Sequence, residues 1–196
     1  MGEQFMSWYA LFVKTGYESS IKKWLDARFD DSLLTSVIPR RKVPEKKDRQ
    51  EYHAIKTLFP GYVFVETKMN FSIYYTLKEN PFIYNSLNYL NNKDKGLLPS
   101  NAQQVHLSSQ KPDESYFFKE IPKDEMLIVL KLISESEVIE YSQVTFQESN
   151  VIVKSGPLKG MESLIKKVDK HKKRAKVLMN IMGREQLVDF GIEIIR

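Results

Sequence analysis

The sequence predicts an α+β protein, with an N-terminal α/β domain (an antiparallel sheet flanked by helices) and a small C-terminal β-barrel. The first observation is a set of strand-like runs, residues 8–13 and 61–66, separated by a stretch of helical spacing at 16–29. The second is that residues 150–196 offer about five short strands, too few residues for anything but a small barrel. The third is a separation of charge along the chain.

The N-terminal part begins with a buried strand at residues 8–13, WYALFV, whose residues are β-prone and apolar. Thr15 and Glu18 have the spacing of a capping box. An amphipathic helix at 16–29 follows, and a short strand at 35–38. The apolar face of that helix consists of Ile21, Trp24, Leu25 and Phe29.

Residues 40–49, RRKVPEKKDR, are charged and predict an exposed loop or hairpin tip. Residues 61–66, GYVFVE, are the clearest strand of the first half because their side chains alternate. A helix is expected at 70–79, starting at Asn70 and stopping before Asn80-Pro81, and a strand at 82–90.

Residues 91–120 are rich in polar residues without a period, and we expect a long excursion there. Pro122 favours the first turn of a helix that extends to Ile133, with acidic residues near its positive end. Residues 135–149 are acidic and predict a linker. The C-terminal strands are expected at 151–154, 162–168, 174–182, 185–190 and 192–195.

The C-terminal part carries the most distinctive stretch. A strand from Val151 breaks at Ser155-Gly156-Pro157, and a cationic tip follows at residues 170–174. Residues 149–196 hold eleven Lys and Arg against five Asp and Glu, whereas residues 113–148 hold three against nine. Oppositely charged segments suggest more than one partner surface, one of them for nucleic acid.

Composition narrows the class of protein. The chain has no cysteine, which excludes disulfides and suits the cytoplasm. No signal peptide is expected, and the strongest apolar run, 126–133, is too short to span a membrane. The three histidines, His53, His106 and His171, share no metal-ligand spacing, and no phosphate-binding glycine motif occurs. We therefore expect no enzyme activity, no metal and no cofactor.

Three motifs in order resemble the bacterial NusG family of transcription elongation factors. They are Trp8-Tyr9, the run LFPGYVFV at 58–65, and the Ser155-Gly156-Pro157 turn. The resemblance covers nearly the whole chain. It implies a NusG-like domain at 1–134 with an insertion at about 91–120, a linker at 135–149, and a KOW domain, an SH3-like β-barrel, at 150–196.

The resemblance also suggests a specialised paralog. The KOW turn of housekeeping members carries aromatic residues for Rho and a ribosomal protein, and this chain has Leu158 and Met161 there. The family's further glycine in this loop falls at Ser163. Residues 156–162, GPLKGME, and 182–184, MGR, resemble instead the LoaP-type antiterminators, which act on selected operons through an RNA hairpin.

Three sets of candidate binding residues follow from the resemblance and from charge. The first set is the expected surface for the clamp helices of the RNA polymerase β′ subunit: Trp8, Tyr9, Phe59, Pro60, Tyr62 and Phe64. These residues could equally be ordinary core residues. Within the set, Tyr62 and Phe64 are favoured as interface residues, and Trp8 as a residue that supports them from behind. Candidate contacts to upstream or non-template DNA, or else a solvated hairpin tip, are Arg40, Arg41, Lys42, Lys46, Lys47 and Arg49.

The third set holds the candidate contacts to a nascent RNA hairpin: Lys154, Lys159, Lys166, Lys167, Lys170, His171, Lys172, Lys173, Arg174, Lys176 and Arg184. This cluster has no aromatic residue for base stacking, which favours recognition of shape and phosphate. Arg174 and Arg184 are expected to make base-edge or bidentate phosphate contacts, because a guanidinium can do both.

The predicted function is a monomeric, non-enzymatic elongation factor that binds RNA polymerase and nascent RNA and promotes processive antitermination of selected operons. One alternative is a housekeeping NusG that acts with Rho and the ribosome. Another is a ribosome-associated RNA-binding protein, and a third is an RNA-modifying enzyme with a KOW-like module.

Overall fold

The computed structural model describes residues 6–86, 118–148 and 150–195, so most of the predicted excursion at 91–120 lies outside the described residues. The chain divides into two compact units, Met1–Val37 with Gly61–Ile121 and Ile38–Pro60 with Pro122–Arg196. These units cut across the expected domains, because residues 38–60 group with the C-terminal part. The boundaries at 134 and 149 stay a prediction.

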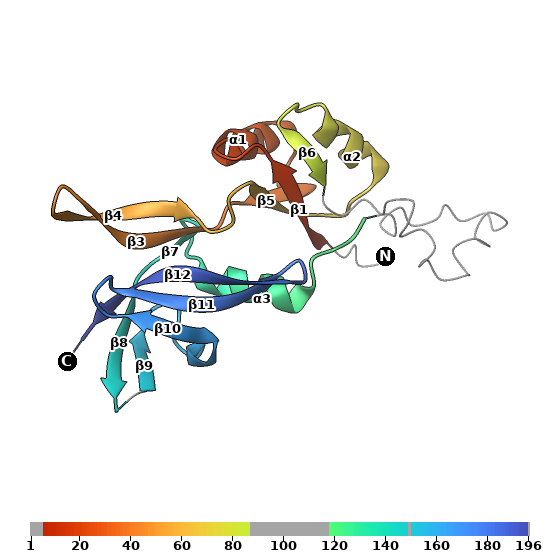
Figure 1. Ribbon diagram of the computed structural model, residues 1–196. Coiled ribbons are helices and arrows are strands. Elements are labelled where there is room, and N and C mark those ends of the chain that lie inside the picture. Colours follow the sequence, from red (N-terminus) through yellow and green to blue (C-terminus); the bar gives the residue numbers. More distant parts are fainter. Residues whose placement is uncertain (1–5, 87–117, 149, 196) are drawn as a thin grey trace. The chain divides into compact units, whose positions relative to one another are not determined.

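The first unit is built on an antiparallel sheet in the order β2-β5-β1-β6. Its strands are β1 (Ser7–Val13), β2 (Leu34–Val37), β5 (Tyr62–Thr67) and β6 (Ile83–Ser86), and its helices are α1 (Glu18–Arg28) and α2 (Phe71–Lys78). Figure 1 shows both helices on the same side of this sheet. The predicted strands and helices of residues 8–79 are therefore confirmed to within two residues at each end.

Alternation along β1 and β5 gives the sheet two different faces. Tyr9, Leu11 and Val13 are buried on one face, together with Val63 and Val65 of the neighbouring strand. The other face carries Trp8, Ala10 and Phe12 opposite Glu66, Phe64 and Tyr62. On this face Phe12 is exposed, whereas the central pair Ala10 and Phe64 is fully buried.

The two helix starts follow different rules. The side chain of Asn70 caps α2 as predicted, because its Oδ1 accepts a hydrogen bond from the backbone N–H of Ile73 at 2.8 Å. The predicted capping box of α1 is wrong: its N-cap residue is Tyr17, which makes no side-chain cap bond. Glu18 instead accepts from the backbone N–H groups of Gly16 and Gly61.

The second unit contains a five-stranded sheet in the order β10-β11-β12-β8-β9. The strands are β8 (Ser142–Gln147), β9 (Asn150–Ser155), β10 (Ile165–Asp169), β11 (Arg174–Ile181) and β12 (Arg184–Ile194), and a short 3-10 helix spans Glu162–Leu164. β12 is one continuous strand, not the two that the sequence predicts. It pairs with β11 up to Gly191 and then, in parallel, with β8.

The acidic segment at 135–149, predicted as a linker, contains regular structure. It forms β7 (Val138–Ile139) and the whole of β8, in which Val138, Ile139 and Val144 are apolar and buried. Its role as a linker between domains stays a prediction. Before it, α3 (Lys123–Leu132) begins directly after Pro122, as predicted. The carboxylate of Glu125 in α3 accepts a hydrogen bond from the backbone N–H of Met182 at 2.6 Å.

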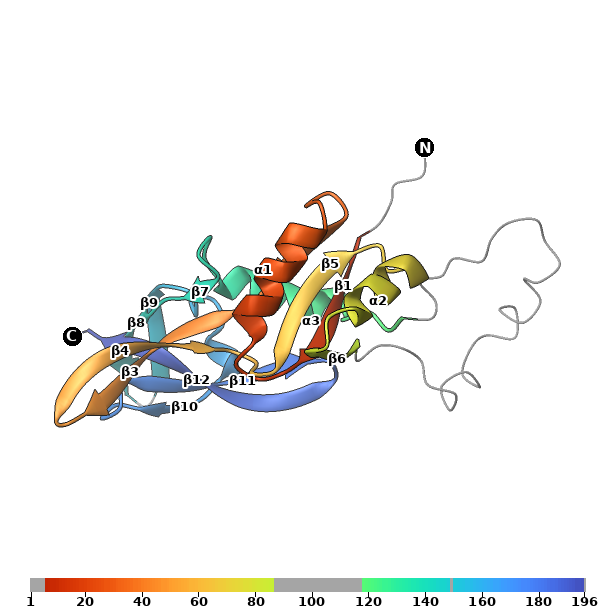
Figure 2. The same ribbon diagram turned by 90° about the horizontal axis from the view of Figure 1, so that it is seen from above.

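A three-stranded sheet, β4-β3-β7, completes the second unit. β3 (Arg40–Lys47) and β4 (Gln50–Thr57) form an antiparallel hairpin, and β3 also pairs in parallel with β7. Figure 2 shows the hairpin extending beyond its neighbours. The stretch 40–49, predicted as an exposed loop or hairpin tip, is thus part of a hairpin: residues 40–47 form a regular strand, and only Asp48-Arg49 form the turn.

Candidate nucleic-acid and protein interfaces

An aromatic cluster lies on the open face of the first sheet. Phe12 pairs with Tyr62 across the strands, and its ring lies 5.6 Å from Tyr62 and 5.8 Å from Tyr84 between centroids. Phe12 and Tyr84 are 38% and 46% exposed, and Tyr62 is half-buried. We call Phe12, Tyr62 and Tyr84 the aromatic patch. Exposed aromatic groups of this kind are typical of protein-binding surfaces.

The residues predicted to bind polymerase separate into two groups. Tyr9, Phe59 and Phe64 are buried, with exposed fractions of 1%, 3% and 0%, so each serves a core in this structure. Trp8 and Tyr62 are half-buried, and Pro60 is exposed. Phe12 and Tyr84 were missed from the sequence, although the alternation that places Trp8 and Phe12 on one face could have found Phe12.

The basic hairpin is fastened to the rest of the second unit at its base. The guanidinium of Arg40 donates to the backbone oxygen of Ser136 at 2.9 Å, and Lys42 pairs with Glu140 at 3.0 Å. Arg41 donates to the backbone oxygen of Asp189 in β12, and burial lowers the pKa of its guanidinium. These three of the predicted DNA contacts are occupied inside the chain.

The tip of the hairpin is different. Asp48 and Arg49 both have positive φ, 52° and 66°, as the two-residue type I′ turn requires. Lys46, Lys47 and Arg49 are exposed, and within the described ranges none has an ion pair. We call residues 46–49 the hairpin tip. It holds the three predicted DNA contacts that remain available to a ligand.

A second cationic element connects β10 to β11, and we call residues 170–173 the basic turn. The Asp169 carboxylate accepts from the backbone N–H of Lys172 at 2.9 Å, which lowers the pKa of Asp169 and fixes the turn. The Lys170 ammonium lies 3.7 Å from the centroid of the Phe146 ring. His171 and Lys172 are exposed, whereas Lys173 forms an ion pair with Glu51 of β4 at 2.8 Å.

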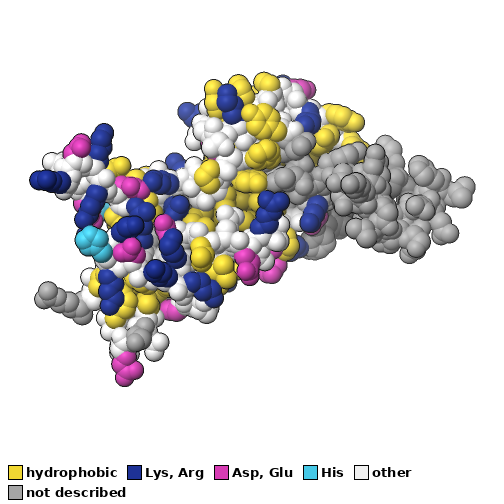
Figure 3. Space-filling model, viewed as in Figure 1, with side chains coloured by type: hydrophobic (Ala, Val, Ile, Leu, Met, Phe, Trp, Pro, Cys, Tyr) yellow, Lys and Arg dark blue, Asp and Glu magenta, His cyan; other side chains and the backbone are white. Residues whose placement is uncertain are grey.

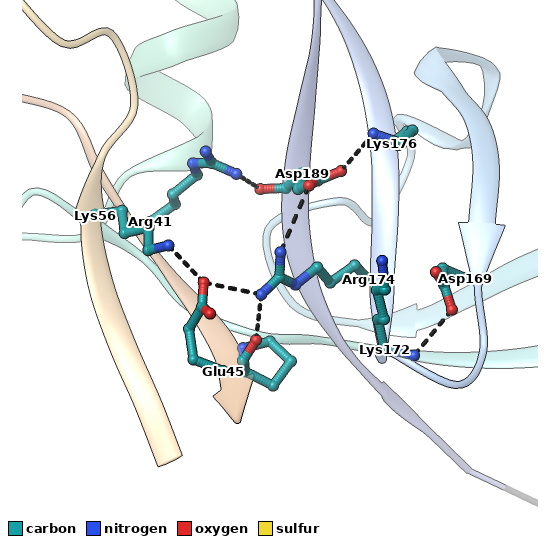
Figure 4. A network of polar contacts seen from close by, with 9 residues as sticks. Arg41, Glu45, Lys56, Asp169, Lys172, Arg174, Lys176 and Asp189 are labelled. Carbon is teal, nitrogen blue, oxygen red and sulfur yellow. Dashed lines mark hydrogen bonds and ion pairs between the residues drawn. The ribbon is translucent and has the colours of Figure 1, made fainter. Parts of the chain in front are cut away.

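Arg174 lies at the centre of a polar network that joins the hairpin to the C-terminal sheet (Figure 4). Its guanidinium donates to the backbone oxygen of Pro44 and to the Glu45 carboxylate at 3.0 Å, and it lies 3.6 Å from the Asp189 carboxylate. Glu45 also pairs with Lys56, and Asp189 with Lys176. We call Arg41, Glu45, Lys56, Arg174, Lys176 and Asp189 the Arg174 network.

This network places two predicted RNA contacts, Arg174 and Lys176, in internal ion pairs. The prediction that Arg174 reads base edges therefore conflicts with its half-buried position and its three acceptors. The remaining candidates, Lys154, Lys159, Lys166, Lys167 and Arg184, are exposed on other parts of the unit. Figure 3 shows Lys and Arg side chains gathered over the hairpin and β10–β12.

The Ser155-Gly156-Pro157 turn has a structural role in the second unit. Gly156 has φ +94°, and a Cβ there would meet the Ser142 Cα and the Tyr141 oxygen, each at 2.7 Å. The Ser142 hydroxyl accepts from the backbone N–H of Leu158, whose side chain is 1% exposed. The turn therefore packs against β8 and points Leu158 into the core.

Among the described residues no cluster of three or more metal-ligating side chains occurs, and no helix is long and apolar enough to cross a membrane. The arrangement defines a class: a chain with an aromatic patch suited to a protein partner in one unit and a cationic surface suited to nucleic acid in the other.

The comparisons identify the family. The family model described as "Transcription termination factor nusG" matches residues 6–105, half of the chain, and the chain belongs to the NusG family. The transcription termination/antitermination protein NusG of Staphylococcus carnosus is 27% identical over 187 residues, covering 93% of this chain and 90% of that protein. The NusG protein of Staphylococcus aureus strain Mu50 is also 27% identical, over 189 residues.

A solved structure titled "Domain interaction in Thermotoga maritima NusG" is similar in fold. It aligns with a TM-score of 0.51 and 22% identity, covering 97% of this chain and 96% of that one. The NusG-like fold predicted from the three motifs is thus supported along nearly the whole length.

Proposed function

We propose that this chain is a non-enzymatic transcription elongation factor that suppresses termination at selected operons. The N-terminal sheet binds RNA polymerase at the β′ clamp helices, and the C-terminal sheet, as a KOW domain, binds a hairpin in the nascent RNA. A factor tethered at two sites gains effective concentration at the operon that carries the hairpin. Because differential binding to the elongating state changes its lifetime, the mechanism needs no cofactor.

The polymerase-binding part of the proposal is supported by the aromatic patch. Phe12 and Tyr84 are exposed, Tyr62 is half-buried, and the Phe12 ring lies beside both tyrosine rings. Trp8 lies on the same sheet face and is separated from Phe12 by the buried pair Ala10 and Phe64. The exposed cations of the hairpin tip are available for the predicted contacts to the phosphates of upstream or non-template DNA.

The single observation that carries the specialised function is the chemistry around the Gly156 turn and the basic turn. Housekeeping members are expected to carry aromatic residues in this turn for their protein partners, and this chain has Leu158 and Met161 there. Leu158 is buried and Met161 is half-buried, so the turn presents no aromatic side chain to a partner. Cations of the basic turn stand exposed instead. The C-terminal sheet therefore offers charge for a phosphate backbone in place of an aromatic anchor.

The test uses purified elongation complexes on leader templates with and without the RNA hairpin. Wild type should raise terminator readthrough only on the hairpin template, and Lys170→Ala with Lys172→Ala should abolish that dependence. Lys23→Ala with Lys131→Ala removes the same charge from two exposed helix positions and should leave readthrough unchanged. Readthrough that does not depend on the hairpin would contradict the RNA tether.

Housekeeping action with Rho is the second candidate, favoured by the names of the 27% identical relatives. A pull-down with purified Rho separates the two candidates. The absence of an exposed aromatic at described residues 156–162 predicts no retention of Rho. Strong retention through the C-terminal sheet would favour the housekeeping function.

A further inference from the structure

The hairpin tip and the basic turn, which are 120 residues apart in the sequence, flank one cavity of the second unit. The cavity measures about 340 Å³ and is lined by Pro44, Glu45, Lys46, Glu51, His171, Lys172 and Arg174. Four of these residues come from the hairpin and three from the end of the basic turn and the start of β11. Two surfaces predicted to bind different nucleic acids therefore meet at one place.

The hairpin is held at this place by contacts on both of its strands. On the β3 side, Arg174 binds Glu45 and the Pro44 carbonyl, and Arg41 binds the carbonyl of Asp189. On the β4 side, Glu51 pairs with Lys173. Contacts along two strands fix the direction of the hairpin better than a single ion pair can, since exposed pairs alone contribute little.

These contacts neutralise some of the charged side chains around the cavity and leave others without an ion pair. Both acidic residues of the lining are neutralised inside the unit: Glu45 by Lys56 and Arg174, and Glu51 by Lys173. The hydrogen bonds from Lys56 and Lys173 lower the pKa values of these two carboxyls and keep them ionised. On the lining, Lys46 and Lys172, one from each side, are the cations that form no ion pair with a described residue. They lie near carboxylates, because Lys46 lowers the pKa of Glu51 and Lys172 lowers the pKa of Asp169.

Further positively charged side chains surround the cavity. Lys47 and Arg49 continue the cationic surface on the hairpin side, and Lys170 continues it on the other. The imidazole of His171 is the one aromatic ring on the lining, and no Phe, Tyr or Trp side chain lines the cavity. Ammonium groups on two walls, without a large aromatic ring for base stacking, suit a phosphate backbone rather than unstacked bases.

We propose that the hairpin tip and the basic turn form one composite site that grips the phosphate backbone of a single RNA. The Arg174 network holds the two walls at their spacing, so Arg174 is a positioning residue and does not contact the RNA. This assignment rests on the proposed function, which places nascent RNA on the C-terminal sheet. It adds that residues 46–49 belong to the same RNA site.

The experiment measures binding of a hairpin RNA to the full chain by fluorescence anisotropy at several salt concentrations. The tip variant carries Lys46→Ala, Lys47→Ala and Arg49→Ala, and the turn variant carries Lys170→Ala and Lys172→Ala. Each should raise the Kd roughly tenfold or more and reduce the salt slope by about 1 for each lost phosphate contact. A control with Lys23→Ala, Lys68→Ala and Lys131→Ala loses the same charge as the tip variant at exposed positions away from the cavity and should bind nearly as wild type.

A second variant, Glu45→Gln, distinguishes a composite site from general electrostatics. It makes the chain more positive, so simple charge attraction predicts tighter RNA binding. A composite site predicts weaker binding, because the variant removes the charge of one of the contacts that hold the hairpin wall to Arg174. Tighter binding by Glu45→Gln would overturn the proposal.

The outcomes distinguish failure of the proposed function from failure of the composite site alone. If wild type binds no hairpin RNA, or the turn variant binds as wild type, the proposed function fails. If the turn variant weakens but the tip variant binds RNA normally, the composite site fails alone. The same binding measurement is made with duplex DNA of the same sequence. If the tip variant loses affinity for DNA but not for RNA, the hairpin tip is a separate DNA-binding site and not part of the RNA site.

Discussion

The Glu18 carboxylate closes a turn of the first unit with both of its oxygens. It is 6% exposed, and it accepts the backbone N–H of Gly16 at 2.8 Å and of Gly61 at 2.7 Å. Gly61 directly precedes β5, which carries Tyr62 of the aromatic patch. One side chain at the start of α1 therefore fixes the backbone where the central strand begins.

Replacing Glu18 by Ala should destabilise the first unit by about 1–3 kcal/mol, because two backbone N–H groups lose their acceptor, one of them in a buried bond. Glu18→Gln keeps one acceptor oxygen and should cost less. Urea denaturation monitored by tryptophan fluorescence measures both values, since Trp8 and Trp24 lie in this unit.

Ser19→Ala, at the neighbouring exposed position of α1, is the control and should be close to neutral. Equal stability of Glu18→Ala and wild type would show that these hydrogen bonds contribute nothing net.

The role of Arg174 could be predicted from the sequence only in part. Its position in a cationic run predicts a nucleic-acid contact, and the run does form an exposed turn up to Lys172. Its partners, Pro44 and Glu45, lie 130 and 129 residues away, and no local pattern announces them. Its third partner, Asp189, is much nearer in the sequence, on the neighbouring strand β12. Because the two hairpin partners are remote, the internal role of Arg174 could not be predicted.

The β3–β4 hairpin is the element that departs most from expectation. Charge and Pro44 predict an exposed loop or hairpin tip for the whole of residues 40–49, yet Pro44 is buried in β3 and the strand pairing continues to Lys47. Strand propensity alone is low here, so the strand depends on its neighbours: β7 pairs with its base and β12 contacts its face. The turn itself is Asp-Arg, not the Asn-Gly pair by which such turns are recognised in sequence.

Docking of the hairpin should depend on pH only in the acid range. Hydrogen bonds from Lys56 and Lys173 lower the pKa values of Glu45 and Glu51 below their ordinary 4.5. A carboxyl with a lowered folded-state pKa stabilises docking above its ordinary value, and that contribution is lost as the pH falls through the lowered one. Docking should therefore be constant between about pH 6 and pH 8 and loosen in acid below 4.5.

Because the chain contains no cysteine, the measurement can use Asp48→Cys with His171→Cys, each carrying a spin label. The distance distribution between the labels should broaden in acid. The same pair combined with Glu45→Gln and Glu51→Gln should be broad at every pH, because neither side chain then titrates. A broadening with pH that survives these two substitutions would assign the transition to other groups.

At the scale of the whole molecule, the two predicted binding surfaces lie in different units. The aromatic patch lies entirely in the first unit, and both walls of the cationic cavity lie in the second. Substitutions in one surface should therefore leave the other intact, which makes the two binding activities separable by mutation.

Phe12→Ser with Tyr84→Ala should weaken binding to purified RNA polymerase about tenfold or more, as loss of exposed aromatic anchors commonly does, while RNA affinity stays unchanged. Tyr75→Ala is the matched control, because Tyr75 is 66% exposed on α2 and lies outside the aromatic patch. Biolayer interferometry with immobilised polymerase measures each affinity. Equal loss for Tyr75→Ala and the patch variant would move the interface away from the patch.

The order of strands and helices was largely predictable, because periodic runs such as WYALFV and GYVFVE specify their own structure. The compact units were not, because residues 38–60 join the C-terminal part through β7 and β12 and not through their sequence neighbours. The basic turn was predicted from its charge as an RNA contact, and that stays a prediction, whereas the cavity that it shares with the hairpin was not predicted. The grouping of residues 38–60 and this cavity both depend on contacts between residues far apart in the sequence.

Gly191 has a consequence for how this chain can change over evolutionary time. A Cβ at this position would lie 1.9 Å from the Tyr141 ring and 2.6 Å from the Lys42 carbonyl, so the glycine lets β12, β8 and the hairpin converge. A larger residue could be accepted only with a smaller one at position 141 and a displaced β3. Positions 191 and 141 are therefore expected to change together among related chains that keep this packing of β12 against the hairpin.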